Sequence, residues 1–587
     1  MMYKNLFLIN HMGYRCQDAK RLVYLGRAEN FIVYRLQDLK LTQVFKGRLA
    51  DSAGDEIATA KCGDFSKVTE PGIYRIATDE GNSRCFIVSD NAYDTTARLA
   101  VEFFTWQRCN SDFGWNGNCH AKDSIQLQSG EVRNLGKGHH QSSDLRKWAW
   151  GTSLGIIGLA EYALRCQPLW DKGRIADELR HSADYFMSLI LDNGAVMDCT
   201  WVPQGYDTAM AGKGYGDYAF SWQSPRIYFE SPAPEPAQWN VLRALALIPR
   251  YFINSDPDYS QKCLDCAKRI WAYMQGDGVQ LQDYDLPLYP PLGHEGMTRF
   301  YKGFYPDSAL RHASRAICAQ TLYIAEPDGV YRTAAKDSLE ELARMRVGGD
   351  ITHNPAAACF YEGNRSARLA NNYIYFYCTT VPQAFAGALE LWEDDEQARL
   401  WRECANAIAD QCAIISTHNP FGRLPGTWYT RGNDVFETPG CFSFSTNEAP
   451  AFIQEESGFA EPQGKRMDVE YDYNSFCFNL DLLANAVFLV KMDRLEGNVR
   501  LREVAQRQLD WILGVNPFDA SNIEGVGYNH PHRGLFGEFF PPVPQIPGGV
   551  YTGITDTSFS MEAQGYDCEY DMPMVGWLLC LLSVLQT

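Results

Sequence analysis

Apolar and polar side chains alternate in short runs between residues 4 and 90. Gly, Asp and Asn separate these runs, which read LFLIN, RLVYLG, NFIVYRL, LTQVFKG, EIATA, GIYRIAT and SRCFIVS. A period of two places every second side chain on the same face of a strand, and turn residues at short, regular intervals are typical of antiparallel sheets. The pattern predicts an immunoglobulin-like β-sandwich at residues 1–92.

From residue 93 onward the apolar residues recur every three or four positions. One such stripe contains Ile175, Leu179, Ala183, Phe186 and Ile190, and this spacing buries one face of a helix. About a dozen segments between residues 94 and 585 share the pattern. Six concentric helical hairpins require that number, so we predict that residues 93–587 form an (α/α)6 barrel.

Long connections rich in Gly, Pro and aromatic residues separate the predicted helices. They span residues 194–234, 276–306, 347–379, 417–473 and 515–572. Connections of this length in a compact domain usually carry function. In a helical barrel they would gather at one end, where we expect a cleft.

Charge and cysteine usage narrow the possible partners. The chain has 72 Asp and Glu against 53 Lys and Arg, with no basic run, whereas binding to nucleic acid or to an anionic membrane depends on clustered cations. We therefore expect neither partner. The apolar stretch Leu6–Ile9 is too short for a signal segment, and scattered cysteines are typical of a reducing compartment. We therefore expect a cytoplasmic protein. Cys263 and Cys266 are expected to be packing residues.

Two segments that precede predicted helices carry candidate acid–base residues. In HQSSDLRKW, Asp144 near a helix N-terminus would be kept ionised by main-chain N–H groups, which suits a general base. In CEYDMP, Glu569 has aromatic and apolar neighbours, which raise a carboxyl pKa and suit a proton donor. Asp567 and Asp571 compete with Glu569 for that role. Helix capping is the alternative interpretation of both segments.

A third group of residues has the composition of a metal site. Cys109, Cys119 and His120 are followed by His139 and His140, one of which completes a set of four. Two thiolates and two imidazoles match the tetrahedral preference of structural zinc. The alternative is that the four side chains are buried separately.

The order of motifs along the chain resembles glycoside hydrolase family 9, the inverting cellulases that often join an immunoglobulin-like module to an (α/α)6 barrel. LINHMGYR (residues 8–15) is similar to the opening strand of that module, and HQSSDLRKW occupies the place of the family's base motif. LDWILGVNPF and GVGYNHPHRG, within residues 509–534, resemble the segment that ends in a substrate-binding His-Arg pair.

The resemblance assigns roles to single residues. It implies Asp144 as the base that activates water, Glu569 as the acid, and His532 and Arg533 as binders of sugar hydroxyls, and it selects His140 as the fourth zinc ligand. The chain departs from the family at Gln141, which stands where the base motif has its first Asp. A glutamine amide can hydrogen-bond the water but adds no charge.

We therefore expect an inverting hydrolase of a β-glucan, cello-oligosaccharide or related β-glycoside, acting on short substrates or chain ends. Zinc would be structural, and the chemistry needs no cofactor. Candidate stacking partners for the sugar are Trp148, Trp222 and Trp428. Two alternatives remain: a polysaccharide lyase on a helical toroid, disfavoured by the acidic chain, and a lapsed relative that only binds sugar.

Overall fold

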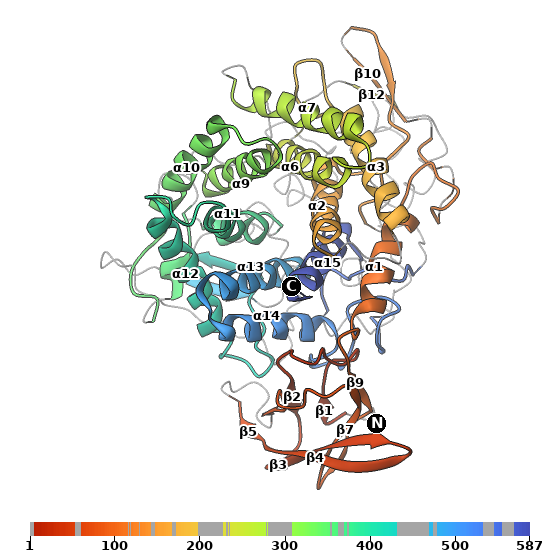
Figure 1. The fold of residues 1–587 in the computed structure, drawn as a ribbon, viewed down its shortest axis with the longest axis vertical. Coiled ribbons are helices and arrows are strands. Elements are labelled where there is room, and N and C mark those ends of the chain that lie inside the picture. Colours follow the sequence, from red (N-terminus) through yellow and green to blue (C-terminus); the bar gives the residue numbers. More distant parts are fainter. Residues whose placement is uncertain are drawn as a thin grey trace, which may run out of the picture.

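A computed structural model of the chain describes the following residues: 5–52, 60–115, 117, 119–121, 123–127, 129–142, 147–166, 172–197, 227–229, 233, 235–276, 279, 308–352, 355–361, 369–372, 375–430, 469–472, 478–531, 545–554 and 569–586. Strands form the N-terminal part and helices most of the remainder (Figure 1). No helix in these ranges combines the length and apolar character needed to cross a bilayer.

Two antiparallel sheets make up the N-terminal part. The first has the order β1 (Phe7–Leu8), β2 (Arg21–Tyr24), β6 (Lys61–Asp64) and β5 (Ala50–Asp51). The second has the order β4 (Lys40–Arg48), β3 (Asn30–Gln37), β7 (Gly72–Thr78) and β8 (Gly81–Asn82), with β9 (Phe86–Val88) also on β7. Their inward residues share one apolar core that includes Phe31, Phe65 and Tyr74, which confirms the predicted β-sheet region.

One predicted strand in this part, the run EIATA at residues 56–60, lies mostly outside the described residues. A described strand close to it in the sequence, β6 with the sequence KCGD, was not predicted. Its only fully buried position is Gly63, so it has no alternation of apolar side chains. Sheet pairing with β2 and β5 places it, which a pattern of side chains cannot reveal.

Six of the described helices form a closed ring. They are α2 (Ala149–Cys166), α6 (Glu235–Phe252), α9 (Ala309–Ala325), α11 (Tyr377–Leu391), α13 (Phe478–Glu496) and α15 (Met572–Gln586). Each contacts the next, and α15 returns to α2 (Figure 1). Buried residues cover all sides of α15, as expected for a helix enclosed by others.

A second set of six described helices lies outside the ring. They are α1 (Asp94–Trp106), α3 (Lys172–Ser188), α7 (Pro257–Met274), α10 (Gly329–Arg344), α12 (Ala398–Ile415) and α14 (Val499–Ile512). Each packs on an inner helix, in the pairs α1 with α15, α2 with α3, α6 with α7, α9 with α10, α11 with α12, and α13 with α14. Their apolar residues cover one face, which explains the helical stripes in the sequence.

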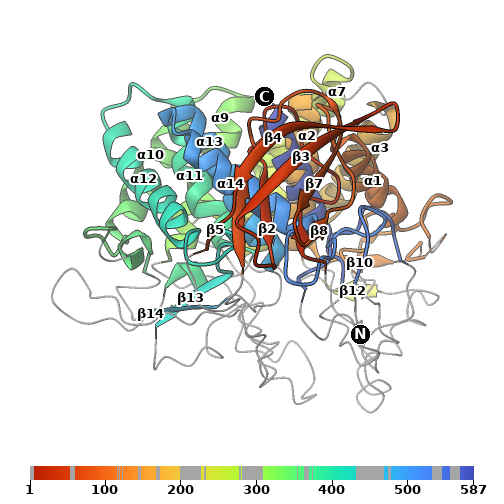
Figure 2. The same ribbon diagram turned by 90° about the horizontal axis from the view of Figure 1, so that it is seen from below.

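Short elements collect at one end of this ring (Figure 2). There, β10 (Ser124–Gln126) pairs antiparallel with β11 (Val132–Asn134) and parallel with β12 (Ile227–Phe229). Strands β13 (Thr427–Thr430) and β14 (Val469–Asp472) form a second pair. Two 3-10 turns, η2 (Pro355–Ala358) and η3 (Ala370–Asn372), precede α11, and η3 contacts β13.

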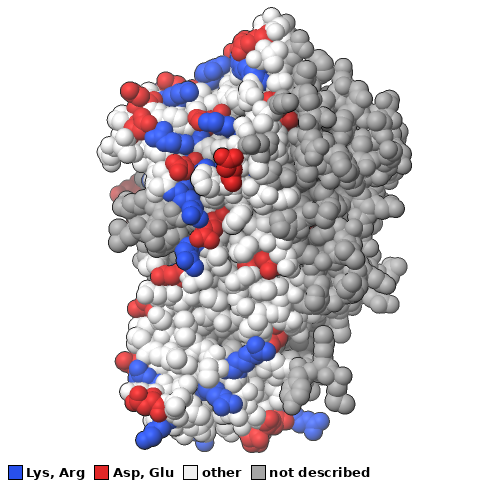
Figure 3. Space-filling view, turned by 90° about the vertical axis from the view of Figure 1, so that its right-hand side faces the viewer, with Lys and Arg blue, Asp and Glu red and all other residues white. Residues whose placement is uncertain are grey.

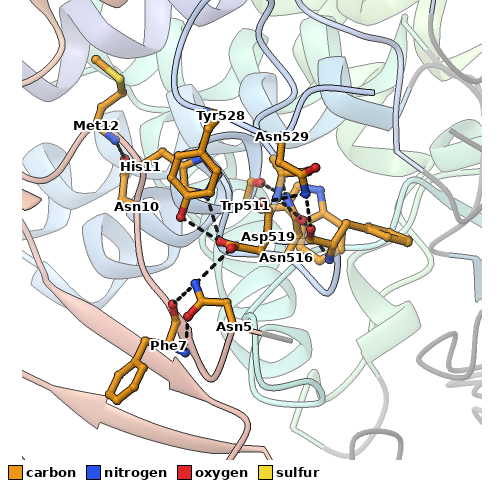
Figure 4. A network of polar contacts seen from close by, with 12 residues as sticks. Asn5, Phe7, Asn10, His11, Met12, Trp511, Asn516, Asp519, Tyr528 and Asn529 are labelled. Carbon is orange, nitrogen blue, oxygen red and sulfur yellow. Dashed lines mark hydrogen bonds and ion pairs between the residues drawn. The ribbon is translucent and has the colours of Figure 1, made fainter. Parts of the chain in front are cut away.

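A polar network joins the β-sheet part to the helical part (Figure 4). The His11 main-chain N–H donates to the Leu513 carbonyl at 2.8 Å, and its Nε2 lies 3.1 Å from Asp519 Oδ1. The His11 ring stacks on Tyr528 with centroids 3.5 Å apart. Burial lowers the pKa of His11. The contacts hold residues 513–531, the segment that leads to His532, against the β-sheet part.

Charges on the described surface are mixed. Figure 3 shows Lys and Arg side chains interspersed with Asp and Glu on one face of the molecule. Elsewhere on the molecule, Arg332 and Lys336 of α10 form ion pairs with Asp395, in the connection between α11 and α12.

Candidate functional site

The two segments with candidate carboxyl groups meet, although they come from opposite ends of the helical part. Ser142 and Asp571 form an antiparallel bridge. The Met572 N–H donates to the Gln141 carbonyl at 2.9 Å. The chain leading to Asp144 therefore runs beside the segment that contains Glu569, as a shared active site requires. Asp144 itself lies outside the described residues.

Glycines in the helices behind these segments explain why they meet. A Cβ on Gly576 of α15 would lie 2.1 Å from the Gly155 carbonyl oxygen of α2, and one on Gly158 would lie 2.2 Å from the Gly576 backbone. Only residues without a side chain allow two helix backbones this close. Because α2 follows the first segment and α15 follows the second, this contact brings both segments together.

Glu569 lies in an extended segment fixed on both sides. Its main-chain carbonyl accepts the Thr552 N–H at 2.8 Å, and Tyr570 forms a bridge with Tyr551. Its side chain is buried, with 6% of the residue exposed. The Tyr570 ring packs on Phe103 of the outer helix α1, at 5.4 Å. Successive side chains of a strand face opposite sides, so Glu569 faces away from α1.

Helix bounds test the capping interpretation of both segments. Helix α2 begins at Ala149, five positions after Asp144, so Asp144 is not its N-cap. Helix α15 begins at Met572, which leaves Asp571, and not Glu569, as the residue just before it. Capping therefore explains neither of the two candidate carboxyl groups.

Residues 143–146 lie between two buried anchors. On one side, His140 N–H donates to the Gln107 carbonyl at 2.9 Å. On the other, Lys147 Nζ donates to the Leu135 carbonyl at 2.6 Å and lies 3.2 Å from Asp123 Oδ2. Both Lys147 and Asp123 are buried. This ion pair was not expected from the sequence, because Lys147 and Asp123 look like ordinary surface residues there.

The four predicted metal ligands lie together. One ligand atom from each of Cys109, Cys119, His120 and His140 lies within 4.8 Å of all the others, and the four residues are buried. Cys119 Sγ is 3.3 Å from His140 Nε2. The Cys109 hydrogen bond, together with His140, lowers the pKa of Cys119. A thiolate among imidazoles is the donor set that zinc prefers, so these residues fit a metal ion.

His139, the alternative fourth ligand, has a different role. Its Nε2 lies 2.8 Å from Glu178 Oε2 on α3, and Arg108 donates to the same oxygen at 2.9 Å. Burial lowers the pKa of His139. The structure thus selects His140 for the cluster, and His139 ties the same strand to α3.

The structure describes only some of the remaining predicted residues. The Gln141 amide packs on Gly151 of α2, where an added Cβ would lie 1.9 Å from its Oε1. Trp148 is 3% exposed, beside Trp150. Trp428 lies in β13, opposite Tyr471, and its side chain is not among the described ones. Trp222, His532 and Arg533 lie outside the described residues.

One residue of this site has no signal in the sequence. The Tyr375 hydroxyl donates to Asp571 Oδ2, and Tyr375 has a φ of +70° just before α11. Its ring meets Trp150 edge-on at 5.0 Å. A tyrosine in a long connection between helices gives no hint of these contacts, because they depend on how the ring closes.

Comparisons with known proteins agree with this architecture. The model of glycosyl hydrolase family 9 matches residues 93–534. A cellodextrinase of Butyrivibrio fibrisolvens is 25% identical over 560 residues, covering 89% of this chain and 86% of the relative. A thermostable endoglucanase from Alicyclobacillus acidocaldarius, a single mutant, superposes with a TM-score of 0.66 at 14% identity, over 99% of both chains. A zinc-binding triple mutant of a family 9 endoglucanase gives 0.64 at 16% identity, over 97% of this chain and 99% of that one.

The family match and these relatives, together with the ring of paired helices, define a glycoside hydrolase. The chain belongs to glycosyl hydrolase family 9. The family match ends at residue 534, so it does not extend to Glu569.

Proposed function

We propose that the chain is an inverting β-glucan hydrolase acting on cello-oligosaccharides or related β-glycosides. The observation that carries the proposal is the bridge between Ser142 and Asp571, which places the segment leading to Asp144 beside the segment of Glu569. In this proposal the ring is an (α/α)6 barrel and the N-terminal sheets are an immunoglobulin-like sandwich, divided near residue 92.

The proposed chemistry uses two carboxyl groups. Asp144 takes a proton from water as the water oxygen bonds to the anomeric carbon. Glu569 gives its proton to the glycosidic oxygen as the bond to that oxygen breaks, and His532 and Arg533 bind neighbouring hydroxyls. Inversion requires the two carboxyl groups to be roughly 6.5–9.5 Å apart, so that the water fits between them.

Short substrates or chain ends are proposed for two reasons. The B. fibrisolvens relative, similar over most of both chains, is named a cellodextrinase. Long connections between helices, such as residues 194–234 and 417–473, would be suited to closing off an open groove. Trp148, Trp222 and Trp428 are the proposed stacking partners of the sugar.

Zinc is the proposed metal for Cys109, Cys119, His120 and His140. Two thiolates and two imidazoles leave no open position for a substrate, so the ion would be structural. It would fix the loop one residue before Gln141. The zinc-binding endoglucanase mutant with a similar fold supports this choice, and the hydrolysis itself needs no cofactor.

A panel of aryl β-glycosides and cello-oligosaccharides tests the proposed function. Product sizes are followed over time, and the anomeric configuration of the first product is read by proton NMR. We expect single sugars released from one end with inverted configuration. A spread of medium-length products from a polymer would contradict end-on action, products absorbing in the near ultraviolet would indicate a lyase, and no product would indicate a binding protein.

A further inference from the structure

Gln141 leaves the base side of the site without the second carboxylate that the resemblance implies. Its amide is buried against Gly151 of α2. The residue beside it, Ser142, is paired with Asp571, and directly opposed residues of an antiparallel pair have their side chains on the same face. The structure therefore brings another acidic residue to this strand from the far end of the sequence.

We propose that Asp571 supplies the missing carboxylate and holds the attacking water together with Asp144. The inference rests on the proposed function. Asp571 accepts a hydrogen bond from the water and remains ionised throughout. The proton leaves the water for Asp144, the water oxygen bonds to the anomeric carbon, and the departing oxygen receives the proton of Glu569.

Chain geometry places Asp571 within reach of that water. Opposed residues in an antiparallel pair have Cα atoms about 5 Å apart, which applies to Ser142 and Asp571. Asp144 follows Ser142 by two residues, which span at most about 7 Å. Glu569 precedes Asp571 by two residues in an extended segment, so both side chains face the same side. The carboxyl groups of Asp571 and Glu569 thus face the same side, beside the segment that leads to Asp144.

The surroundings of Asp571 hold its carboxylate in one orientation. The Tyr375 hydroxyl donates to its Oδ2, and both residues are 2% exposed. Tyr375 has a φ of +70°, a left-handed conformation that costs a non-glycine residue on the order of 1–3 kcal/mol and gathers at functional sites. Packing alone does not require a tyrosine in this strained conformation, with its hydroxyl on one carboxylate.

Helix capping is the other role open to Asp571, since it stands just before α15. An N-cap side chain accepts a hydrogen bond from the second or third N–H of the helix. The second residue of α15 is Pro573, which has no N–H. The third, Met574, donates its N–H to the main-chain carbonyl of Asp571 at 3.2 Å. The first turn of α15 therefore offers the Asp571 side chain few N–H groups to cap.

The substitution Asp571→Asn removes the charge and little else. Asparagine caps a helix as well as aspartate does and still accepts the Tyr375 hydroxyl. We expect kcat on a cello-oligosaccharide to fall by roughly 10- to 100-fold, with KM changed by less than roughly threefold, because the charge acts on the water and not on the sugar. Asp510→Asn, at a buried carboxyl in the interface with the sandwich, is the matched control and should keep the wild-type kcat.

Restoring the charge at the family's own position gives the decisive comparison. Adding Gln141→Asp to Asp571→Asn should raise kcat at least roughly tenfold over the single variant, which a lost cap could not do. Retention of more than half of kcat in Asp571→Asn, or a loss that Gln141→Asp does not relieve, would overturn the inference alone. An inactive wild type would overturn the proposed function and this inference with it. If Asp571→Asn does not fold, Asp571→Ser, another good cap, replaces it.

Discussion

At the scale of single residues, the chain is anchored on both sides of residues 143–146. His140 on one side belongs to the cluster of Cys and His residues that could hold a metal ion, and Lys147 on the other is buried against Asp123. Only residues 143–146 lie between these anchors and outside the described residues. The proposed catalytic base would have to lie within about 1 Å of its productive position, and anchors on both sides of residues 143–146 favour this.

The two proposed proton-transfer residues can be tested separately. Asp144→Asn and Glu569→Gln should each lower kcat by about 10²- to 10⁴-fold, with an unchanged circular dichroism spectrum, because each removes a proton acceptor or donor of the same shape. Glu569→Gln should lose less on aryl glycosides whose leaving group needs no protonation. Activity within about tenfold of wild type in either variant would remove that residue from the mechanism.

Zinc binding is a second prediction at this scale. Cys119→Ser should reduce the zinc content from one ion per chain and lower the thermal midpoint by ~5 °C or more, because the ion ties several connections together. The matched control is Cys263→Ser, a buried thiol on α7 outside the cluster. Elemental analysis of both purified variants gives the result, and wild-type protein without stoichiometric zinc would contradict the prediction.

At the scale of elements, the helical periodicity predicted most of what the structure shows. Stripes such as the one from Ile175 to Ile190 correctly located helices of the outer set, because the apolar residues of a helix with one buried face recur at a regular spacing in the sequence. Which helices pack together was not predictable in the same way. The contact between α2 and α15 depends on Gly155, Gly158 and Gly576, and isolated glycines in a helical pattern usually only lower its helix propensity.

The residues of the candidate site were likewise predictable only in part. Each motif was visible locally, and the four metal ligands were predicted as a set because thiols and imidazoles form a distinctive donor group. The contact of Tyr375 with Asp571 was not predicted, because nothing in the sequence indicates which residues from the ends of different helices meet. The absence of a carboxylate at Gln141 was evident from the sequence, but a replacement could be identified only in the structure.

The glycine contact gives a prediction at this scale. Gly576→Ala should destabilise the fold by about 1–3 kcal/mol or more, since its Cβ would meet backbone that cannot move aside. By separating α2 from α15 it should also lower kcat. Gly329→Ala is the control, because Gly329 lies at the start of helix α10 with open space around it. Urea denaturation compares the two, and equal stability would contradict the proposed close contact.

At the scale of the whole molecule, the β-sheet part is joined to the helical part through buried polar groups. Asp510 of α14 accepts hydrogen bonds from Asn10 of the β-sheet part at 2.8 Å and from Gln506 at 3.0 Å. Burial raises the pKa of Asp510 to about 7, and the nearby Asp18 adds to the effect. In the folded protein this carboxyl therefore keeps its proton over a pH range in which it is ionised in the unfolded chain.

This linkage predicts how interface stability depends on pH. A raised carboxyl pKa stabilises the folded state below the unfolded value, and the contribution is lost as pH rises through about 7, with a slope of up to about 1.4 kcal/mol per pH unit. Asp510→Asn keeps both hydrogen bonds but not the titration, so its urea midpoint relative to wild type should rise between pH 5 and pH 8. Asp395→Asn is the control. Burial opposes ionisation of Asp395, but the Gln397 N–H and Lys336 lower its pKa overall. The difference in urea midpoint between this variant and wild type should therefore stay constant over that range. A constant difference for Asp510→Asn as well would show that the carboxyl between the two parts does not titrate there.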